Sequence, residues 1–379
     1  MTRSGAASAP VTVEDGLARA LELGEVGVQV AAYRHGELIV DSFAGTADSM
    51  TARPVNRDTL FPVFSVTKAI TATALHVQAA RGLVDYDAPI AVYWPEFARN
   101  GKDRITVHHV LTHRSGLPQM PADVTIPRMC DWDWMISSIE DLTPRFEPGT
   151  VSAYQSLVFG WLVAEVVRRT DPDHRPFGSF VRDEISRPLA IDDLWLGVPN
   201  EALPRVAVLY EAPRTSGANR SDLASLAMPS AVAPNAEHHN DAMVLRACLP
   251  GAGAVMTARA GARFFAMLAN GGELDGVRIL PEDHVRWLTT HRERSGERDL
   301  VLDGGLNACP AISVGGFRLS DTIAGDGSDV LCHPGSGGSI AWAELDRGLA
   351  VAICHNRMFD ESTMDEHPFA RLAQGVRST

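Results

Sequence analysis

Residues 69–80 consist almost entirely of helix-forming side chains and leave no broad polar face. The run follows a short apolar stretch, residues 59–64, which Pro62 interrupts, and Gly82 supplies a stop at its end. A helix without a polar face is stable only when other elements cover most of its sides. We therefore expect a central, buried helix, and the rest of the chain must supply the elements that cover it.

Ser65 and Lys68 stand at the start of this helix, three residues apart and therefore on one face. The first turn of a helix offers free backbone N–H groups and a positive dipole end, both of which favour a developing anion. These are the requirements of acyl transfer. The alternative is that Ser65 caps the helix and Lys68 is solvated, because Ser-x-x-Lys is short enough to occur by chance.

The use of basic residues favours the catalytic interpretation. Only Lys68 and Lys102 are lysines among 34 basic residues, so almost every surface cation is an arginine. Arginine stays protonated, whereas a desolvated lysine can lose its proton near neutral pH. We therefore predict that Ser65 is a nucleophile and Lys68 a proton acceptor.

Composition limits the class of protein. A chain of 379 residues suits two domains or one large domain with an insertion, and the net charge of −13 argues against a nucleic-acid or anionic-membrane partner. Residues 1–10 lack the apolar core of a signal peptide, and no run approaches a membrane span. Five cysteines without paired spacing suit reduced thiols, so we expect a cytoplasmic protein.

The order of elements predicts an α/β (α+β) fold, with an antiparallel sheet flanked by helices. Residues 26–34 and 37–44 form a hairpin pattern, and three apolar strands are expected at 330–333, 339–345 and 349–356. Helices are expected at 13–23, 106–113, 157–169, 258–269 and 369–376. Prolines punctuate short helical pieces in between, which predicts a mainly helical domain, residues 86–249, inserted into a sheet domain of residues 1–85 and 250–379. The active site would lie in the cleft between them.

Other side chains of interest have ordinary explanations as well. His109 and His113 are four residues apart, but no acidic ligand accompanies them in a His-Glu-x-x-His frame, so a structural role is favoured over a metal site. The same holds for His238 and His239, in a polar loop. Tyr154 lies just outside a helix start, where a tyrosine is by default a packing residue. The Ala-, Pro- and Asn-rich segment 199–250 suits a wall or cover of a cleft.

Three motifs occur along the chain in this order: Ser65-x-x-Lys68, Tyr154-x-Ser156 and His333-Pro334-Gly335. This order resembles the serine penicillin-recognising enzymes, and most closely the class C β-lactamase-like branch that includes family VIII carboxylesterases. Residues 111–118, 146–150, 271–278 and 335–339 also resemble recurring segments of that branch. The resemblance extends from about residue 13 to 376.

The resemblance implies that Ser65 attacks a carbonyl carbon, that Lys68 and Tyr154 handle its proton, and that an acyl-enzyme forms. The backbone N–H groups of Ser65 and of Ser336, expected on the strand that follows Gly335, would bind the oxyanion.

Ser156, His333 and Gly335 would contact the substrate. Two residues depart from the pattern of lactamases, since Ser156 stands in place of asparagine and His333 in place of lysine. Both changes weaken the expected grip on a β-lactam carboxylate.

We therefore expect a serine acyl-transfer enzyme that takes a small-molecule ester and passes its acyl group to water or to an alcohol or amine, with a preference for a bound acceptor. No cofactor, metal, nucleic acid or membrane is required, and the sequence does not indicate the oligomeric state. One alternative is a β-lactamase or D-amino-acid peptidase. An alternative of another class is a non-catalytic, penicillin-binding-like sensor.

Overall fold

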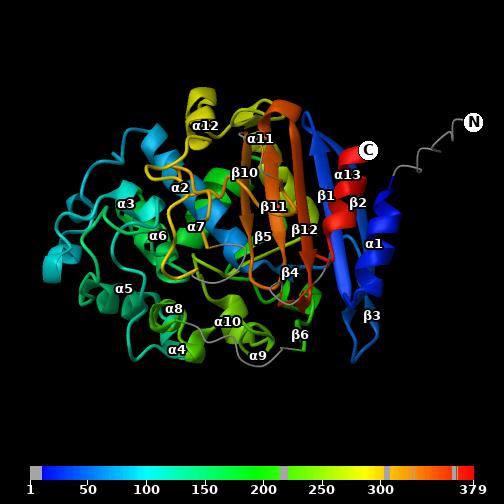
Figure 1. The fold of residues 1–379 in the computed structure, drawn as a ribbon, viewed down its shortest axis with the longest axis horizontal. Coiled ribbons are helices and arrows are strands. Elements are labelled where there is room, and N and C mark those ends of the chain that lie inside the picture. Colours follow the sequence, from blue (N-terminus) through cyan, green and yellow to red (C-terminus); the bar gives the residue numbers. More distant parts are fainter. Residues whose placement is uncertain are drawn as a thin grey trace, which may run out of the picture.

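The computed structural model describes residues 11–213, 221–302, 308–325, 327, 329–360, 364 and 366–379. Residues 1–10, on which the expectation about a signal peptide rests, lie outside the described residues. The centre of the fold is a six-stranded antiparallel sheet with the strand order β10-β11-β12-β1-β2-β3. Helices cover both of its faces (Figure 1).

The sheet joins strands from the two ends of the chain. The N-terminal strands are β1 (Gly27–Arg34), β2 (Glu37–Asp48) and β3 (Arg53–Pro54), and the C-terminal strands are β10 (Val330–Pro334), β11 (Ile340–Glu344) and β12 (Leu349–His355). Strand β12 pairs with β1, so that Val30 lies opposite Ile353. The predicted antiparallel sheet is confirmed, although β2 continues four residues beyond the expected end at position 44.

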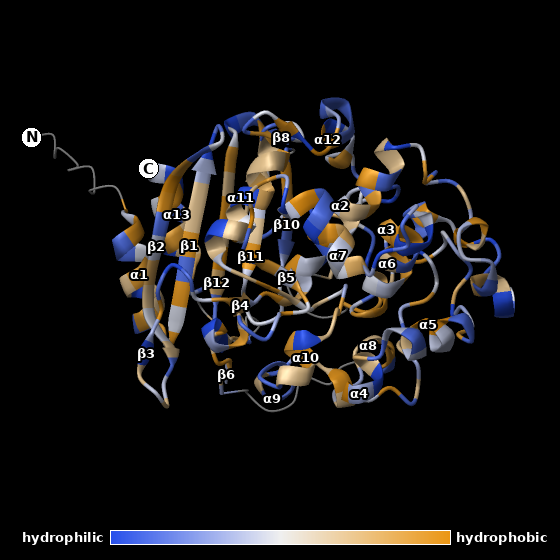
Figure 2. Cartoon of the chain, turned by 180° about the vertical axis from the view of Figure 1, so that it is seen from behind, coloured by the Kyte–Doolittle hydropathy of each residue, from blue (hydrophilic) through white to orange (hydrophobic). Residues whose placement is uncertain are grey.

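Successive side chains along a strand point to opposite faces of the sheet, so alternate residues belong to two different hydrophobic cores. Val28, Val30 and Ala32 of β1 face one side, where α1 (Val13–Glu22) and α13 (Ala370–Ser378) pack against each other and against the sheet. Ala31 and Tyr33 face the other side, which α11 (Ala258–Ala269) covers. Figure 2 shows the hydrophobic colours concentrated on the strands and on α11, with hydrophilic residues on outer helices such as α12 (Glu282–Leu288).

The predicted central helix is α2 (Thr67–Ala80), whose residues are buried from Thr67 to Gln78. A 3-10 turn, η1 (Phe64–Val66), precedes it. A small antiparallel sheet of β4 (Phe61–Pro62), β7 (Ala254–Met256) and β5 (Leu194–Leu196) fixes the approach to this turn. Two chain segments that are far apart in the sequence, around residues 62 and 255, are thereby held side by side at the start of α2.

Most of the remaining elements are short. Helix α6 (Val158–Thr170) packs against α2. The other helices between α2 and β7 are α3 (Val107–Leu111), α4 (Ile126–Met129), α5 (Trp132–Glu140), α7 (Phe177–Val181), α8 (Asp222–Ala227), α9 (Ala236–His239) and α10 (Ala242–Arg246). The other strands are β6 (Tyr210–Glu211), β8 (Glu273–Leu274), β9 (Val277–Arg278) and β13 (Arg357–Met358).

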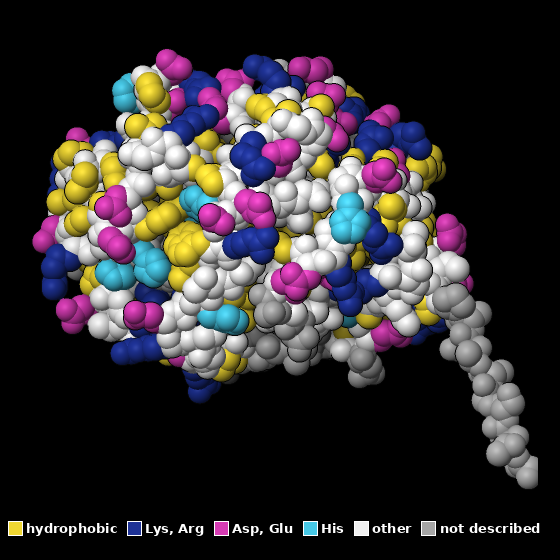
Figure 3. All heavy atoms as spheres, turned by 90° about the horizontal axis from the view of Figure 1, so that it is seen from above, with side chains coloured by type: hydrophobic (Ala, Val, Ile, Leu, Met, Phe, Trp, Pro, Cys, Tyr) yellow, Lys and Arg dark blue, Asp and Glu magenta, His cyan; other side chains and the backbone are white. Residues whose placement is uncertain are grey.

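The surface carries both signs of charge. Figure 3 shows acidic and basic side chains interspersed over the face seen from above. Within the described part of the chain, no helix combines the length and the apolar character that crossing a bilayer requires.

Candidate active site

Ser65 lies in a tight turn that other residues hold in place. Phe64 has a positive φ of 48°, which is unfavourable for a bulky side chain and is typical of strained functional turns. The hydroxyl of Thr67 donates to the carbonyl oxygen of Phe64 and accepts from the N–H of Ala254 (2.9 Å). The cap positions of the turn and of α2 belong to Val63 and Val66, so Ser65 is not the helix cap. Its side chain is half-buried, and its hydroxyl lies near Lys68.

Lys68 is the direct neighbour of the Ser65 hydroxyl. Its Nζ lies 3.0 Å from Ser65 Oγ and donates to the carbonyl oxygens of Ser156 (2.7 Å) and Gly251 (2.9 Å). The side chain is fully buried, and burial lowers the pKa of Lys68 to about 7. A neutral amine has two N–H bonds and one lone pair. Because two carbonyl oxygens take the N–H bonds, the lone pair is left for the proton of Ser65.

Tyr154 stands in the loop before α6, with its ring near the side-chain nitrogen of Lys68. Lys68 Nζ lies 5.2 Å from the centre of the ring. Burial raises the pKa of Tyr154 to about 12, and a hydrogen bond with the Ser65 side chain opposes this rise. The phenol therefore keeps its proton at neutral pH and lies within hydrogen-bonding reach of Ser65. The structure brings Ser65, Lys68 and Tyr154 together, as the sequence led us to expect, while their catalytic roles stay a prediction.

The turn after β10 completes the surroundings of Ser65. His333 lies in β10, opposite Ala341 of β11. A Cβ atom on Gly335 would lie 2.3 Å from the carbonyl oxygen of Val63, so glycine is required for the close approach of this turn to the Ser65 turn. Ser336 was expected on a strand. This was wrong, because β10 ends at Pro334 and Ser336 lies in the turn, half-buried.

His333 is buried, and its Nδ1 lies 2.8 Å from the carbonyl oxygen of Pro334, which assigns the proton to Nδ1. Burial, helped by the nearby charge of Lys68, holds the pKa of His333 well below its usual value. The ring is therefore neutral at physiological pH. Ser156 is buried as well, and its carbonyl oxygen, rather than its hydroxyl, provides the contact with Lys68.

His113 contacts Tyr154. The two ring centres lie 4.6 Å apart, and His113 Nδ1 accepts a hydrogen bond from the N–H of Gln155 (3.2 Å). Burial and the charge of Lys68 lower the pKa of His113. His109 accepts from the N–H of Thr106 at the start of α3. Among the described residues, no group of three or more His, Cys, Asp or Glu side chains is arranged to hold a metal ion.

The expectation for His238 and His239 needs a correction. They belong to α9 and not to a polar loop, and His239 is buried with its ring centre 4.8 Å from that of Phe64. Leu209 and Ala236 pack against Phe64 in the same cluster. Part of the 199–250 segment therefore packs against the turn that carries Ser65, through Phe64.

Comparison with known proteins identifies the family. The family model described as Beta-lactamase matches residues 13–375. The chain belongs to the beta-lactamase family. It is 34% identical over 357 residues to the Esterase/beta-lactamase LipL of Mycobacterium tuberculosis (strain ATCC 25618 / H37Rv), a match that covers 90% of this chain and 79% of that protein.

Solved structures of this family agree with the fold. The crystal structure of a family VIII carboxylesterase is 31% identical, with a TM-score of 0.88 over 99% of both chains. A penicillin-binding protein homologue from Caulobacter crescentus is 30% identical, with a TM-score of 0.82 over 96% of this chain and 97% of that one. The resemblance and the fold class expected from the sequence are therefore confirmed. The protein is a serine hydrolase of the beta-lactamase family.

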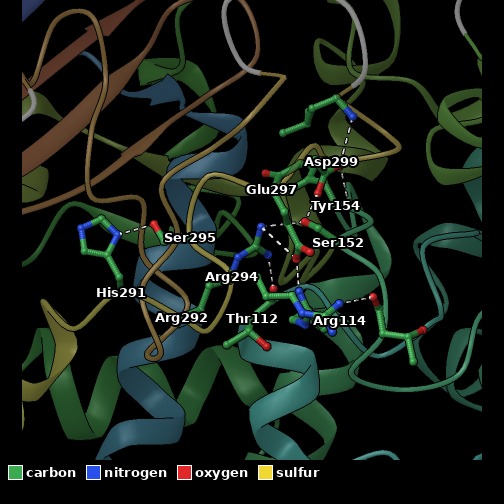
Figure 4. A network of polar contacts seen from close by, with 12 residues as sticks. Thr112, Arg114, Ser152, Tyr154, His291, Arg292, Arg294, Ser295, Glu297 and Asp299 are labelled. Carbon is green, nitrogen blue, oxygen red and sulfur yellow. Dashed lines mark hydrogen bonds and ion pairs between the residues drawn. The ribbon is translucent and has the colours of Figure 1, made fainter.

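Sequence reasoning missed a second set of polar residues, which surrounds the Tyr154 loop of this beta-lactamase-family fold. Asp299 accepts from the N–H of Tyr154 (3.0 Å) and from the hydroxyl of Ser152 (2.7 Å), and Arg292 reaches the same hydroxyl (2.7 Å; Figure 4). Residues 292–299 contain six charged side chains, a pattern typical of a solvated loop. No local signal marks Asp299 and Arg292 as buried.

Proposed function

We propose that the protein forms an acyl-enzyme at Ser65 from small-molecule esters and passes the acyl group to water or to an alcohol or amine. The observation that carries this proposal is the environment of Lys68, whose Nζ lies 3.0 Å from Ser65 Oγ with both of its other contacts made by carbonyl oxygens. A buried amine with a pKa of about 7 is a base matched to neutral pH.

The reaction follows from this arrangement. Lys68 takes the proton of the Ser65 hydroxyl as Oγ forms a bond with the carbonyl carbon of the ester, and the carbonyl π electrons move to oxygen. The N–H groups of Ser65 and Ser336 would bind this oxyanion. As the tetrahedral intermediate collapses, the bond to the leaving oxygen breaks and the proton passes from Lys68 through Tyr154 to the departing alkoxide. Water or another acceptor then repeats the sequence in reverse.

The residues near the reacting centre favour neutral esters over β-lactams. His333 is uncharged at neutral pH because of its burial, so it offers no fixed cation to a substrate carboxylate. An apolar cluster of Ala224, Ala227 and Val301 packs beside Tyr154 and suits an uncharged group. Ester hydrolysis appears in the names of the similar proteins, since LipL is called an esterase/beta-lactamase and the similar solved structure a family VIII carboxylesterase.

The proposed division of the chain also bears on the site. Ser65, Lys68 and Ser336 belong to the proposed sheet domain, residues 1–85 and 250–379, and Tyr154 and Ser156 to the proposed helical insertion, residues 86–249. On this division the reaction takes place in the cleft between the two parts. We retain both the domain boundaries and the cleft as proposals.

A comparison of acyl donors tests the proposed function. The protein is incubated with a p-nitrophenyl ester, a chromogenic cephalosporin or a D-alanyl amide, and the intact mass is followed over time. We expect the ester to acylate Ser65 fastest. Faster acylation by the cephalosporin or the amide would indicate a lactamase or peptidase instead, and no adduct with any donor would indicate a non-catalytic sensor.

The acceptor is tested in the same system. Amines and alcohols at millimolar concentration are added to the acylated protein, and the transfer product is compared with the free acid. Saturable transfer to one acceptor would show that a pocket fills beside the acyl-enzyme. A dominant yield of free acid with every acceptor would assign the protein as an esterase.

The acylation rate should depend on pH through Lys68. Because the base must be neutral, the rate should be lost as the pH falls through the pKa of about 7 and should reach a plateau above it. His113 and His333 should not cause this loss, since burial holds the pKa of both rings well below its usual value. The measurement is the release of p-nitrophenol between pH 5 and 9, followed at its isosbestic wavelength. A rate that is independent of pH or falls with rising pH would contradict this assignment.

Replacement of Tyr154 by phenylalanine should lower the acylation rate by about a hundredfold or more, the usual scale of a lost acid–base group. The ring remains against His113, so the melting temperature should change little. The measurement is single-turnover acylation together with thermal unfolding. A fall in stability with an unchanged rate per folded molecule would show that Tyr154 is only a packing residue.

A further inference from the structure

Asp299 is a buried carboxylate whose hydrogen bonds converge on the Tyr154 loop. It is fully buried, and it accepts four hydrogen bonds, from the hydroxyl of Ser152 and from the N–H groups of Tyr154 (3.0 Å), Val301 (3.0 Å) and Leu302 (3.1 Å). The three N–H groups donate to Oδ1 and the hydroxyl of Ser152 donates to Oδ2. Two of these four donors come from the Tyr154 loop and two from the segment that carries Asp299, so this side chain joins the two.

A second set of hydrogen bonds joins the same two segments. The N–H of Leu300 donates to the carbonyl oxygen of Ser152 (3.0 Å). Arg292, also buried, donates to the hydroxyl of Ser152 and to the carbonyl oxygen of Thr112. Figure 4 shows Asp299 and Arg292 reaching Ser152, whose hydroxyl therefore bridges a buried carboxylate and a buried guanidinium. Residues 291–302, called the clamp segment below, thus hold the loop through side chains and backbone.

Residues 153–155 of the Tyr154 loop lie outside the helices and strands, so the loop depends on other contacts for its position. Its three consecutive N–H groups, from Ala153 to Gln155, donate to the carbonyl oxygen of His113 (3.0 Å), to Asp299 (3.0 Å) and to Nδ1 of His113 (3.2 Å). Asp299 is therefore the only one of these acceptors outside His113. Ser65 lies in the turn η1 and Lys68 in α2, so these three bonds, together with that of Lys68 to the carbonyl oxygen of Ser156, contribute to the alignment of the phenol with Ser65.

We propose that Asp299 is a positioning residue, which holds Tyr154 in register with Ser65 and Lys68 by binding its backbone N–H and the hydroxyl of Ser152. The proposal rests on the role of Tyr154 in the proposed function. Asp299 does not touch the reacting atoms. It acts through Tyr154, and this distinguishes it from a residue that merely stabilises the fold.

A double-mutant cycle tests this role. Asp299→Asn keeps the size of the side chain but removes its charge and replaces one of its two acceptor oxygens with an NH2 group, so the side chain can no longer accept from all four donors. In the wild-type background it should lower the single-turnover acylation rate by about tenfold or more, because small misplacements of a reacting group are costly. In the Tyr154→Phe background, where no phenol remains to be positioned, the same change should alter the rate by less than about twofold, since residues that act as a unit are not additive. Equal falls in both backgrounds would overturn the proposal.

Glu293→Gln is the matched control. Glu293 lies in the same clamp segment and is exposed, so its replacement makes the same change of charge without touching Asp299 or the Tyr154 loop. We expect its acylation rate to stay within about twofold of wild type, as for independent sites. A fall as large as that of Asp299→Asn would show that the clamp segment acts only by general stability.

If Asp299→Asn fails to fold, Ser152→Ala replaces it, because it removes one of the four donors and keeps the charge of Asp299. The same loss of effect in the Tyr154→Phe background is expected, with a smaller fall in rate. Persistence of the full effect in that background would overturn the proposal. If the wild-type protein itself is not acylated by esters at Ser65, the proposed function fails. If wild type reacts and Asp299→Asn is as fast, only the positioning role fails.

Discussion

Replacement of Ser65 by alanine is expected to abolish ester turnover and covalent labelling while the fold remains intact. The hydroxyl lies 3.0 Å from Lys68 Nζ and is the group that would form the acyl bond. Its loss removes no helix cap, because Val63 and Val66 occupy the cap positions and Thr67 makes the hydrogen bonds of the turn. The effect on the free energy of unfolding should therefore stay near the value of one hydrogen bond, about 1 kcal/mol.

The measurement is intact mass after incubation with a p-nitrophenyl ester, combined with thermal unfolding. Thr67→Val serves as a matched control in the same turn, since it removes a hydroxyl that binds backbone groups. This variant should lose stability while its folded fraction can still be acylated at Ser65. Labelling of the Ser65→Ala protein at the wild-type rate would refute the proposed mechanism.

Regular elements with a clear hydrophobic period were predictable from the sequence. Helix α11 begins and ends where expected, at Ala258 and Ala269, because Thr257 caps it with a hydrogen bond from the N–H of Ala260 and Gly271 follows its end. The alternation in β1 and β12 similarly reports two buried faces. At the other helices and strands expected with bounds, the differences amount to a few residues at the ends, where capping and fraying compete.

The rarity of lysine in the sequence was weak evidence for a catalytic role of Lys68. Lys102, the other lysine, is also buried, and it donates to the carbonyl oxygens of Glu140 (2.7 Å) and Leu142. Burial lowers its pKa to about 8. Both lysines therefore share an environment of carbonyl oxygens, and rarity alone does not separate them. The difference is the hydroxyl of Ser65 beside Lys68, which the Ser-x-x-Lys spacing did predict.

Contacts between distant parts of the chain were out of reach of sequence patterns. Gly251 and Lys68 meet because β7 pairs with β4, and Asp299 meets Tyr154 across 145 positions of sequence. Neither residue lies in a periodic run that would mark it as buried. Local patterns report which face of an element is covered, but not which loop covers it, so the partners that tune Lys68 and hold Tyr154 needed the structure.

Replacement of Lys68 by arginine is expected to lower the acylation rate by about 10²- to 10⁴-fold, the range of a lost general base. Arginine keeps the positive charge but cannot give up its proton near neutral pH. Lys68→Met is the matched control, because it fills the same buried space without charge and also lacks a base. Both variants should be slow in single-turnover acylation, so the charge itself is not what the reaction needs. A near-normal rate for arginine would reduce Lys68 to a fixed cation.

Stability provides an independent measure of the same amine. Burial lowers the pKa of Lys68 from 10.5 to about 7, so between these pH values the unfolded chain binds more protons than the folded protein. The contribution of Lys68 to the free energy of unfolding should therefore rise with pH from 7 to 10.5, by about 5 kcal/mol at about 1.4 kcal/mol per pH unit. The measurement is denaturant unfolding of wild type and Lys68→Met across this range, because their difference isolates Lys68 from other titrating groups. A difference that does not change with pH would mean that Lys68 remains an ammonium in the folded protein, and the neutral-amine mechanism would then have no base.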